Sequence, residues 1–181
     1  MDYINQHWLT SNTIFGLTHF ITATIGLILG LGILFLKPGS KTHKISGYIF
    51  IPILLFVNVS ALFIHEMGMT FGPFHYIIPF SLYFLFLGIK PFLFKTKGEE
   101  RIRTHIKGMV GAALGLWAAF FAELFARTPC INKVLLSFGG DTFWVLTIEG
   151  FVFVFIFLII IRVVKNRQYR RLNLTNGKPT A

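Results

Sequence analysis

The sequence has few charged residues for its length. Asp, Glu, Lys and Arg together make up 13% of the 181 residues, whereas hydrophobic residues make up 54%, with 22 Phe among them. A soluble domain usually carries about a quarter of its residues as charged side chains. The shortage of charge excludes an ordinary water-soluble globule and a disordered chain, and it predicts a polytopic membrane protein.

Cysteine is also scarce, and the common catalytic motifs are missing. The single Cys130 excludes an internal disulfide framework and a Cys-rich metal module. The sequence contains no G-x-x-x-x-G-K-[ST] phosphate loop, no H-E-x-x-H and no G-x-S-x-G. The sequence therefore leaves open whether the protein is an enzyme, and a membrane oxidoreductase is the enzyme class that the residues discussed below allow.

Long charge-free runs predict the membrane spans. No charged residue lies between Asp2 and Lys37, between Lys44 and Glu66, or between Glu66 and Lys90. Each run is long enough for a helix of about 20 residues, which crosses the hydrocarbon core of a bilayer. Two weaker runs follow, and each contains one Glu. We predict an all-α bundle of five transmembrane helices, with a four-helix core plus one, near residues 12–36, 45–66, 72–94, 104–126 and 142–163.

The positions of the basic residues predict the orientation of these helices. Fifteen of the 17 Lys and Arg residues follow the first span, flank the loop between the third and fourth spans, or follow the fifth span. Because Lys and Arg are retained in cytoplasmic loops, we expect the N-terminus outside and the C-terminus in the cytoplasm. One domain over residues 1–171 and a disordered cytoplasmic tail over 172–181 are expected. The net charge of +10 then reflects topology and lipid contacts, with no nucleic-acid partner.

Ionisable residues inside the predicted spans are candidates for function, because a polar group in hydrocarbon is costly. His19, Glu123 and Glu149 lie within the spans. Other histidines sit at the ends of predicted helices, where an ordinary interfacial polar residue is the alternative interpretation. These are His43, His75 and His105.

The four histidines of the first four helices form two predicted pairs. Antiparallel threading places His19 and His75 toward the outer face, and His43 and His105 at the cytoplasmic face. Two imidazole pairs from alternate helices can bind two haems in a four-helix bundle, because each iron needs two axial ligands. The first hypothesis is therefore a b-type haem protein that moves electrons across the membrane.

A second hypothesis uses the outer side alone. Counting about 1.5 Å per residue from the helix starts places His19 about 10 Å below the outer surface, and His75 and Glu123 about 5 Å below it. A His/His/carboxylate set with an open position can bind zinc or copper, and Glu149 could add a fourth or supporting ligand. Such a metalloprotein could be hydrolytic, or it could serve in assembly or sensing.

A third hypothesis needs no cofactor. Gly26 and Gly30 share one face of the first helix with His19. Small residues in this pattern leave room for a flat cofactor, but they equally permit close packing of membrane helices. The chain would then be a structural or interaction subunit.

Short motifs across the first four helices resemble those of a known family. The run THFITATIGLILGLGILFLKPGSKTHKISGYIF has a His on a Gly-rich helix, then a basic loop with Gly-Ser, a His, and a Gly four residues later. A Phe-His pair and an H-x-x-x-M motif follow on the third and fourth helices. Over about residues 12–130 the chain resembles a widespread family of predicted bacterial membrane proteins of unknown function, which implies a multi-pass protein of the bacterial inner (plasma) membrane. The matching residues are His19, Gly39, Ser40, His43, Gly47, Phe74, His75, His105 and Met109, followed by Arg127.

The histidine pattern is in turn similar to that of the ascorbate-reducible two-haem cytochromes b. In those proteins four successive helices each give one haem ligand, and THKISG and RTHIKG resemble their inner-ligand segments. This similarity implies haem b held by His19, His75, His43 and His105. The haem hypothesis also predicts a quinol or another redox partner.

Overall fold

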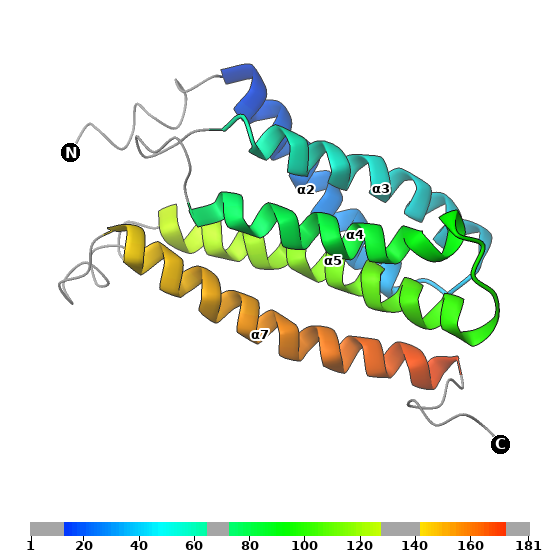
Figure 1. Ribbon diagram of the computed structural model, residues 1–181. Helices are drawn as coiled ribbons and strands as arrows, with labels where there is room; N and C mark the ends of the chain where they lie inside the picture. The colour runs from blue at the N-terminus through cyan, green and yellow to red at the C-terminus, as the bar shows by residue number, and fades with distance from the viewer. Residues whose placement is uncertain (1–12, 65–72, 128–141, 173–181) are drawn as a thin grey trace. The chain divides into compact units, whose positions relative to one another are not determined.

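The computed structural model describes residues 13–64, 73–127 and 142–172, and every element in these ranges is a helix (Figure 1). A short 3-10 turn, η1 (Pro73–Tyr76), leads directly into the helix that follows it. The predicted all-α class is confirmed for this described part of the chain, in which no strand occurs. The α-helices are α2 (Thr13–Phe35), α3 (Lys41–Ala61), α4 (Ile77–Leu93), α5 (Gly98–Arg127) and α7 (Thr142–Arg171).

Within the described ranges, three helical segments are long and apolar enough to cross a membrane. They are Gly16–Phe35 in α2, Lys41–Ala61 in α3 and Gly98–Leu124 in α5. The apolar helix α4 has 17 residues, slightly fewer than the usual span of about 20. The chain is therefore a membrane protein in contact with the lipid bilayer, as the composition predicts, and the count of five spans stays a prediction.

The outer surfaces of these helices suit hydrocarbon. On α2, Phe20, Ile28 and Phe35 are 62%, 69% and 70% exposed. Exposed apolar patches of this extent are rare on soluble monomers, where they cause aggregation. In a bilayer the lipid tails cover them, so the exposed aromatic and aliphatic side chains agree with the membrane assignment.

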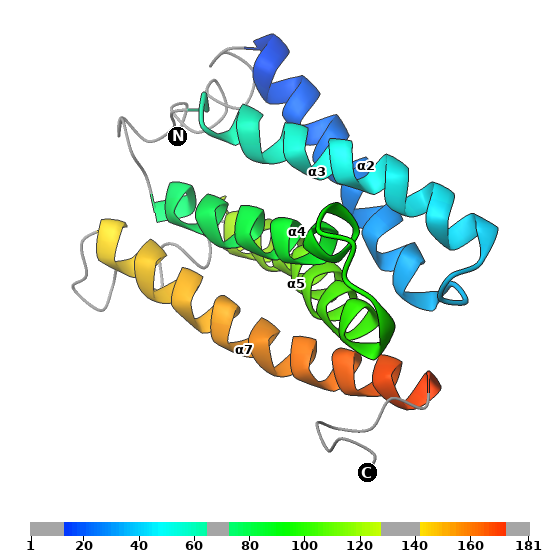
Figure 2. The ribbon, with the colours of Figure 1, turned by 45° about the vertical axis from the view of Figure 1, so that its right-hand side comes forward.

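The first compact unit, residues 1–78, contains α2 and α3 as an antiparallel pair (Figures 1 and 2). A tight turn joins the two helices, and in it Gly39 has a φ of 78°, which favours glycine. Ser40 then caps α3, because its hydroxyl accepts a hydrogen bond of 3.2 Å from the backbone N–H of His43. The buried residues of the pair include Leu27, Ile33, Phe50 and Leu54, together with the small residues Gly26 and Gly30.

The second compact unit, residues 79–181, is built on α5. This helix packs along α7 and also meets α4 (Figure 1). It is the most buried of the three candidate spans. Small side chains let it lie close to both neighbours. Those buried on α5 include Ala112, Ala113, Ala118 and Ala122.

Glycines bring α4 and α5 into backbone contact. A Cβ atom added to Gly108 would overlap the backbone of Gly88, and one added to Gly111 would overlap the ring of Phe84. A Cβ atom added to Gly88 would lie 2.6 Å from the sulfur of Met109. The crossing therefore requires residues without a side chain, as close helix contacts in membranes commonly do.

Two helices extend well beyond the ends predicted from the charges. α5 begins at Gly98 instead of 104, and α7 continues to Arg171 instead of ending at 163, whereas α3 begins at Lys41, within four residues of the predicted start at 45. The third predicted helix opens with η1. The predicted ends marked the edge of the hydrocarbon, whereas the helices continue into polar turns that caps and ion pairs stabilise. In α5, for example, Glu99 pairs with Arg103 one turn later at 2.6 Å.

Candidate functional site

His19 lies about two turns into α2 and is half-buried. Its Nδ1 is 2.8 Å from the Oγ of Ser60 on α3. The hydroxyl of Ser60 donates its single proton to the carbonyl of Val57 at 3.1 Å, so it accepts from His19. The Nδ1 of His19 therefore carries a proton, and Nε2 is the basic nitrogen of the neutral ring.

His105 is held against α4 in a similar way. Its Nδ1 is 2.9 Å from the carbonyl oxygen of Gly88. A carbonyl oxygen can only accept, so Nδ1 is again the donor and Nε2 the basic nitrogen of the neutral ring. The ring also meets Phe92 edge-on, with centroids 5.0 Å apart and an interplanar angle of 83°. The predicted position of His105 at a helix end is wrong, because α5 starts about two turns earlier, at Gly98.

His43 occupies the first turn of α3, where Ser40 holds its backbone N–H. Its half-buried imidazole forms a hydrogen bond with the backbone of Ile33, near the end of α2. The residue thus fastens the turn between the two helices. This structural role stands beside the predicted role of His43 as a haem ligand.

His75 is the third residue of η1 and lies two residues before the start of α4. Only 8% of it is exposed. Its place at the start of the third predicted span agrees with the prediction that His75 lies at a helix end. A buried imidazole there is consistent with a functional role, because burying a polar ring is costly unless the site gives it partners.

The candidate ligands divide between the two compact units. His19, His43 and His75 belong to the first unit, and His105 and Glu123 belong to the second. The inner haem pair and the outer metal set each combine residues of both units. Both sets therefore stay predictions.

The carboxylate candidates are described only in part. Glu123 is half-buried on α5, whereas the side chain of Glu149 lies outside the described residues, although its backbone belongs to α7. Within each unit, the described residues contain no group of three or more His, Cys, Asp or Glu side chains that could hold a metal ion. A single unit therefore offers no complete metal site among these residues.

Sequence reasoning missed the groups that orient the imidazoles. The sequence could have pointed to Ser60, because it is a polar residue inside an apolar span. In the structure it is only 4% exposed. No feature of the sequence pointed to the carbonyl of Gly88, because its role depends on how closely α4 approaches α5. Both acceptors follow from packing between helices, which a single sequence does not reveal.

The donor chemistry of these histidines fits a haem iron or a zinc ion. Imidazole nitrogen is the commonest metal ligand, and a ligand His usually donates its other ring N–H to an oxygen acceptor. His19 and His105 both have this arrangement. The same hydrogen bonds would also satisfy a buried imidazole that binds nothing.

Comparison with known proteins gave one match. Residues 16–162 match the model of a family described as "Predicted membrane protein (DUF2306)". No curated protein and no solved structure matches the chain. The matched range contains α3, α4 and α5 together with most of α2 and α7, so it includes every candidate His and Glu.

Proposed function

The chain belongs to the DUF2306 family of predicted membrane proteins, and from that membership and the two oriented imidazoles we propose that it is a b-type haem protein that moves electrons across the membrane. The family match confirms the resemblance to predicted membrane proteins of unknown function. The similarity to two-haem cytochromes b remains a hypothesis, supported by the histidine pattern and by the hydrogen bonds described above.

The observation that carries the proposal is the orientation of His19 and His105. A neighbouring helix takes the Nδ1 proton in each case, through the hydroxyl of Ser60 or the carbonyl of Gly88. Such a bond fixes the ring and leaves Nε2 as the nitrogen that can donate to iron. One oriented ring lies on α2 and the other on α5, so each can serve a different centre.

Each haem requires a second axial ligand. We assign His75 to the outer centre beside His19, and His43 to the inner centre beside His105. This assignment assumes five spans in a bacterial inner membrane, with the N-terminus outside and the C-terminus in the cytoplasm. When bound, haem b supplies one-electron exchange. The chain orients His19 and His105 through these hydrogen bonds, and a quinol or another redox partner supplies the electrons.

A non-haem metalloprotein is the second candidate, and the Nε2 of His19 favours it as well. Zinc or copper would bind His19, His75 and Glu123, with Glu149 as a supporting ligand. Glu123 supports this alternative, because a half-buried carboxyl group inside a span is costly. Haem is preferred because it uses the orientation of both imidazoles, whereas the metal site leaves His105 without a role.

The absorption spectrum of the purified full-length protein tests the proposal. Protein from cells supplied with a haem precursor should show a sharp Soret band, α-bands on reduction, and about two iron atoms per chain. A colourless preparation with stoichiometric zinc or copper contradicts haem binding and favours the outer metal site. A colourless, metal-free preparation made without chelators contradicts both and leaves a structural or interaction subunit.

Single substitutions then assign the ligands. His19→Ala should lose the outer centre from the reduced-minus-oxidised spectrum, and His105→Ala should lose the inner one. Adding His75→Ala to the first variant should cause little further loss, because either ligand is needed for the same iron. His7→Ala is the matched control, since His7 precedes α2, and it should keep both centres. A folded His19→Ala protein with full haem content contradicts the assignment.

A further inference from the structure

A cleft of about 520 Å³ lies within the second unit, between α4, α5 and α7. Its polar lining consists of Lys107 from α5 and of Arg162, Lys165 and Asn166 from α7. None of the residues that line it is acidic. The cleft therefore presents three cations and an amide with no carboxylate beside them.

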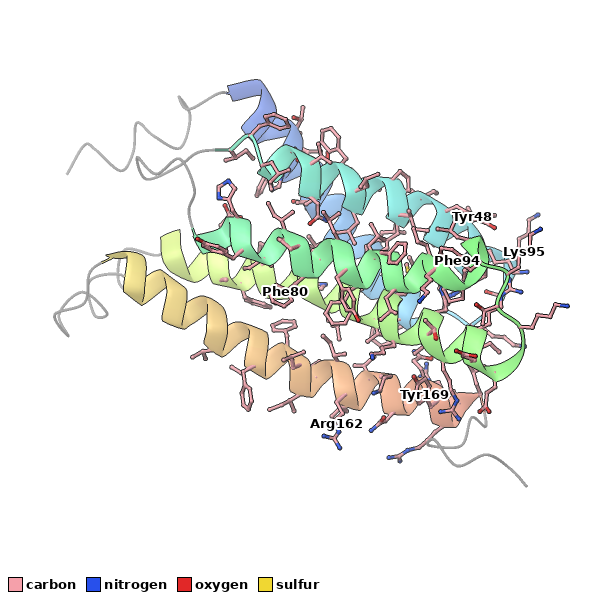
Figure 3. All side chains as sticks on the ribbon, in the orientation of Figure 1. Tyr48, Phe80, Phe94, Lys95, Arg162 and Tyr169 are labelled. Atoms are coloured by element: carbon pink, nitrogen blue, oxygen red, sulfur yellow. The ribbon has the colours of Figure 1, made fainter. Side chains whose placement is uncertain are left out.

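Helical spacing explains why only some of the basic residues of α7 face this cleft. The lining residues of α7 recur at intervals of three and four, which places them on one side of the helix. Arg167, in the same basic segment, is exposed and does not line the cleft. In Figure 3 the head of Arg162 extends away from the helices, which leaves Lys107 and Lys165 as the other two cations of the lining. The lining residues on α7 are Leu158, Ile161, Arg162, Lys165 and Asn166.

Tyr169 fastens α7 to α5 beside the cleft. Its hydroxyl donates to the carbonyl of Arg103 at 3.2 Å, and its ring centre lies 5.3 Å from the guanidinium carbon of the same residue. The Nζ of Lys165 lies 5.8 Å from the same ring centre. Burial raises the pKa of the Tyr169 phenol by more than the nearby charge of Arg103 lowers it. The pKa is therefore raised overall, and the hydroxyl stays protonated at neutral pH. Tyr169 thus braces α5 against α7 one turn after Lys165.

The rest of the cleft is apolar. Phe84 of α4 and Leu158 and Ile161 of α7 line it. One turn before Leu158, toward the middle of α7, Phe155 is 67% exposed, and Ile159 beside the lining residues is 53% exposed, so the apolar surface of the helix extends past the cleft. A ligand with an anionic head and hydrocarbon chains matches both the basic part and the apolar part.

We propose that this cleft binds the phosphate group of an anionic phospholipid, with Lys107 and Lys165 as its ligands and the acyl chains along α7. Basic clefts between membrane helices bind anionic headgroups, and each basic residue near the bilayer surface contributes about 1 kcal/mol. A lipid is favoured over free phosphate because the apolar wall would have no role with an inorganic ion. The site is independent of haem or metal binding.

Native mass spectrometry of the detergent-purified full-length protein tests the site. The chain is titrated with dihexanoyl phosphatidylglycerol, with dihexanoyl phosphatidylcholine and with inorganic phosphate. Phosphatidylglycerol should bind at least about tenfold more tightly than phosphatidylcholine, whose headgroup has no net charge. The double variant Lys107→Gln/Lys165→Gln should bind phosphatidylglycerol about 25-fold more weakly, because about 1 kcal/mol per lysine corresponds to about fivefold in affinity.

Two further variants separate the cleft from general charge. Arg167→Gln removes one positive charge from the same helix at a side chain that does not line the cleft, so its affinity for phosphatidylglycerol should stay within about twofold of the wild type. Lys107→Arg/Lys165→Arg keeps both charges and should keep binding. Lys107 is exposed and Lys165 half-buried, so neither holds the core, and all variants should share one thermal unfolding midpoint.

Several results would overturn the proposal. Equal loss of affinity in the Arg167→Gln protein would reveal a general charge effect. Unchanged binding in the double glutamine variant would remove the lysines as ligands. Inorganic phosphate that binds as tightly as phosphatidylglycerol, through the same lysines, would replace the lipid with a free anion.

Discussion

At His19 a single hydroxyl decides which ring nitrogen is basic. The Oγ of Ser60 acts as the donor to Val57 and as the acceptor for His19. Hydrogen bonds between membrane helices often contribute only about 0.6 kcal/mol, because the unfolded chain also finds partners in the membrane. Loss of the acceptor alone should cost more, because it leaves the partly buried N–H of His19 without this partner.

Ser60→Ala should therefore lower the free energy of unfolding by about 1–3 kcal/mol, the usual cost of a buried polar group that loses its partner. It should also weaken cofactor binding at the outer centre by about 10- to 100-fold, the usual effect of removing a group that orients a ligand. Thermal unfolding in detergent and titration with haem measure the two effects. Ser60→Thr keeps a hydroxyl and should restore both. An alanine variant with wild-type stability would show that the bond contributes nothing.

At the scale of helices, the crossing of α4 and α5 leaves no space for an added side chain at Gly108. The backbone of Gly88 faces Gly108, and backbone moves less easily than a flexible side chain. The same contact brings the carbonyl of Gly88 to His105. A methyl group here should separate the helices and lengthen that hydrogen bond.

Gly108→Ala should lower stability by about 1–3 kcal/mol, the usual cost of overpacking a close contact. Gly115→Ala is the matched control on the same helix, because a Cβ atom there would meet nothing within 4 Å. It should raise stability by up to about 1 kcal/mol, the helix propensity difference between Gly and Ala. Thermal unfolding midpoints of the two variants in one detergent test this contrast. If Gly108→Ala were tolerated as well as Gly115→Ala, the backbone contact would be absent in the membrane.

At the scale of the whole molecule, the sequence predicted the elements better than their contacts. Charge-free runs identified the helices, because hydrocarbon excludes charge over a length that the bilayer sets. The ends of α5 and α7 were missed, because polar turns continue these helices beyond the apolar core. His19 was found because a polar residue stands out inside an apolar span, and His105 because each of the first four predicted helices carries one such His. Their acceptors, and the cleft that Lys107 shares with Lys165, depend on which helices pack together, and one sequence does not contain that information.

Orientation is the whole-molecule prediction that follows from the basic residues. Cys130 lies outside the described residues, in the segment between α5 and α7, and it is expected on the outer side. The segment between α4 and α5 is rich in lysine and should be cytoplasmic, because basic loops are retained there.

A membrane-impermeant maleimide applied to intact spheroplasts should therefore label Cys130, relative to the labelling of denatured protein. In a Cys130→Ala background, Lys97→Cys provides the opposite control and should react only after the cells are opened. Labelling of Lys97→Cys alone in intact cells would reverse the orientation. Labelling of both positions, or of neither, would mean that α5 does not cross the bilayer.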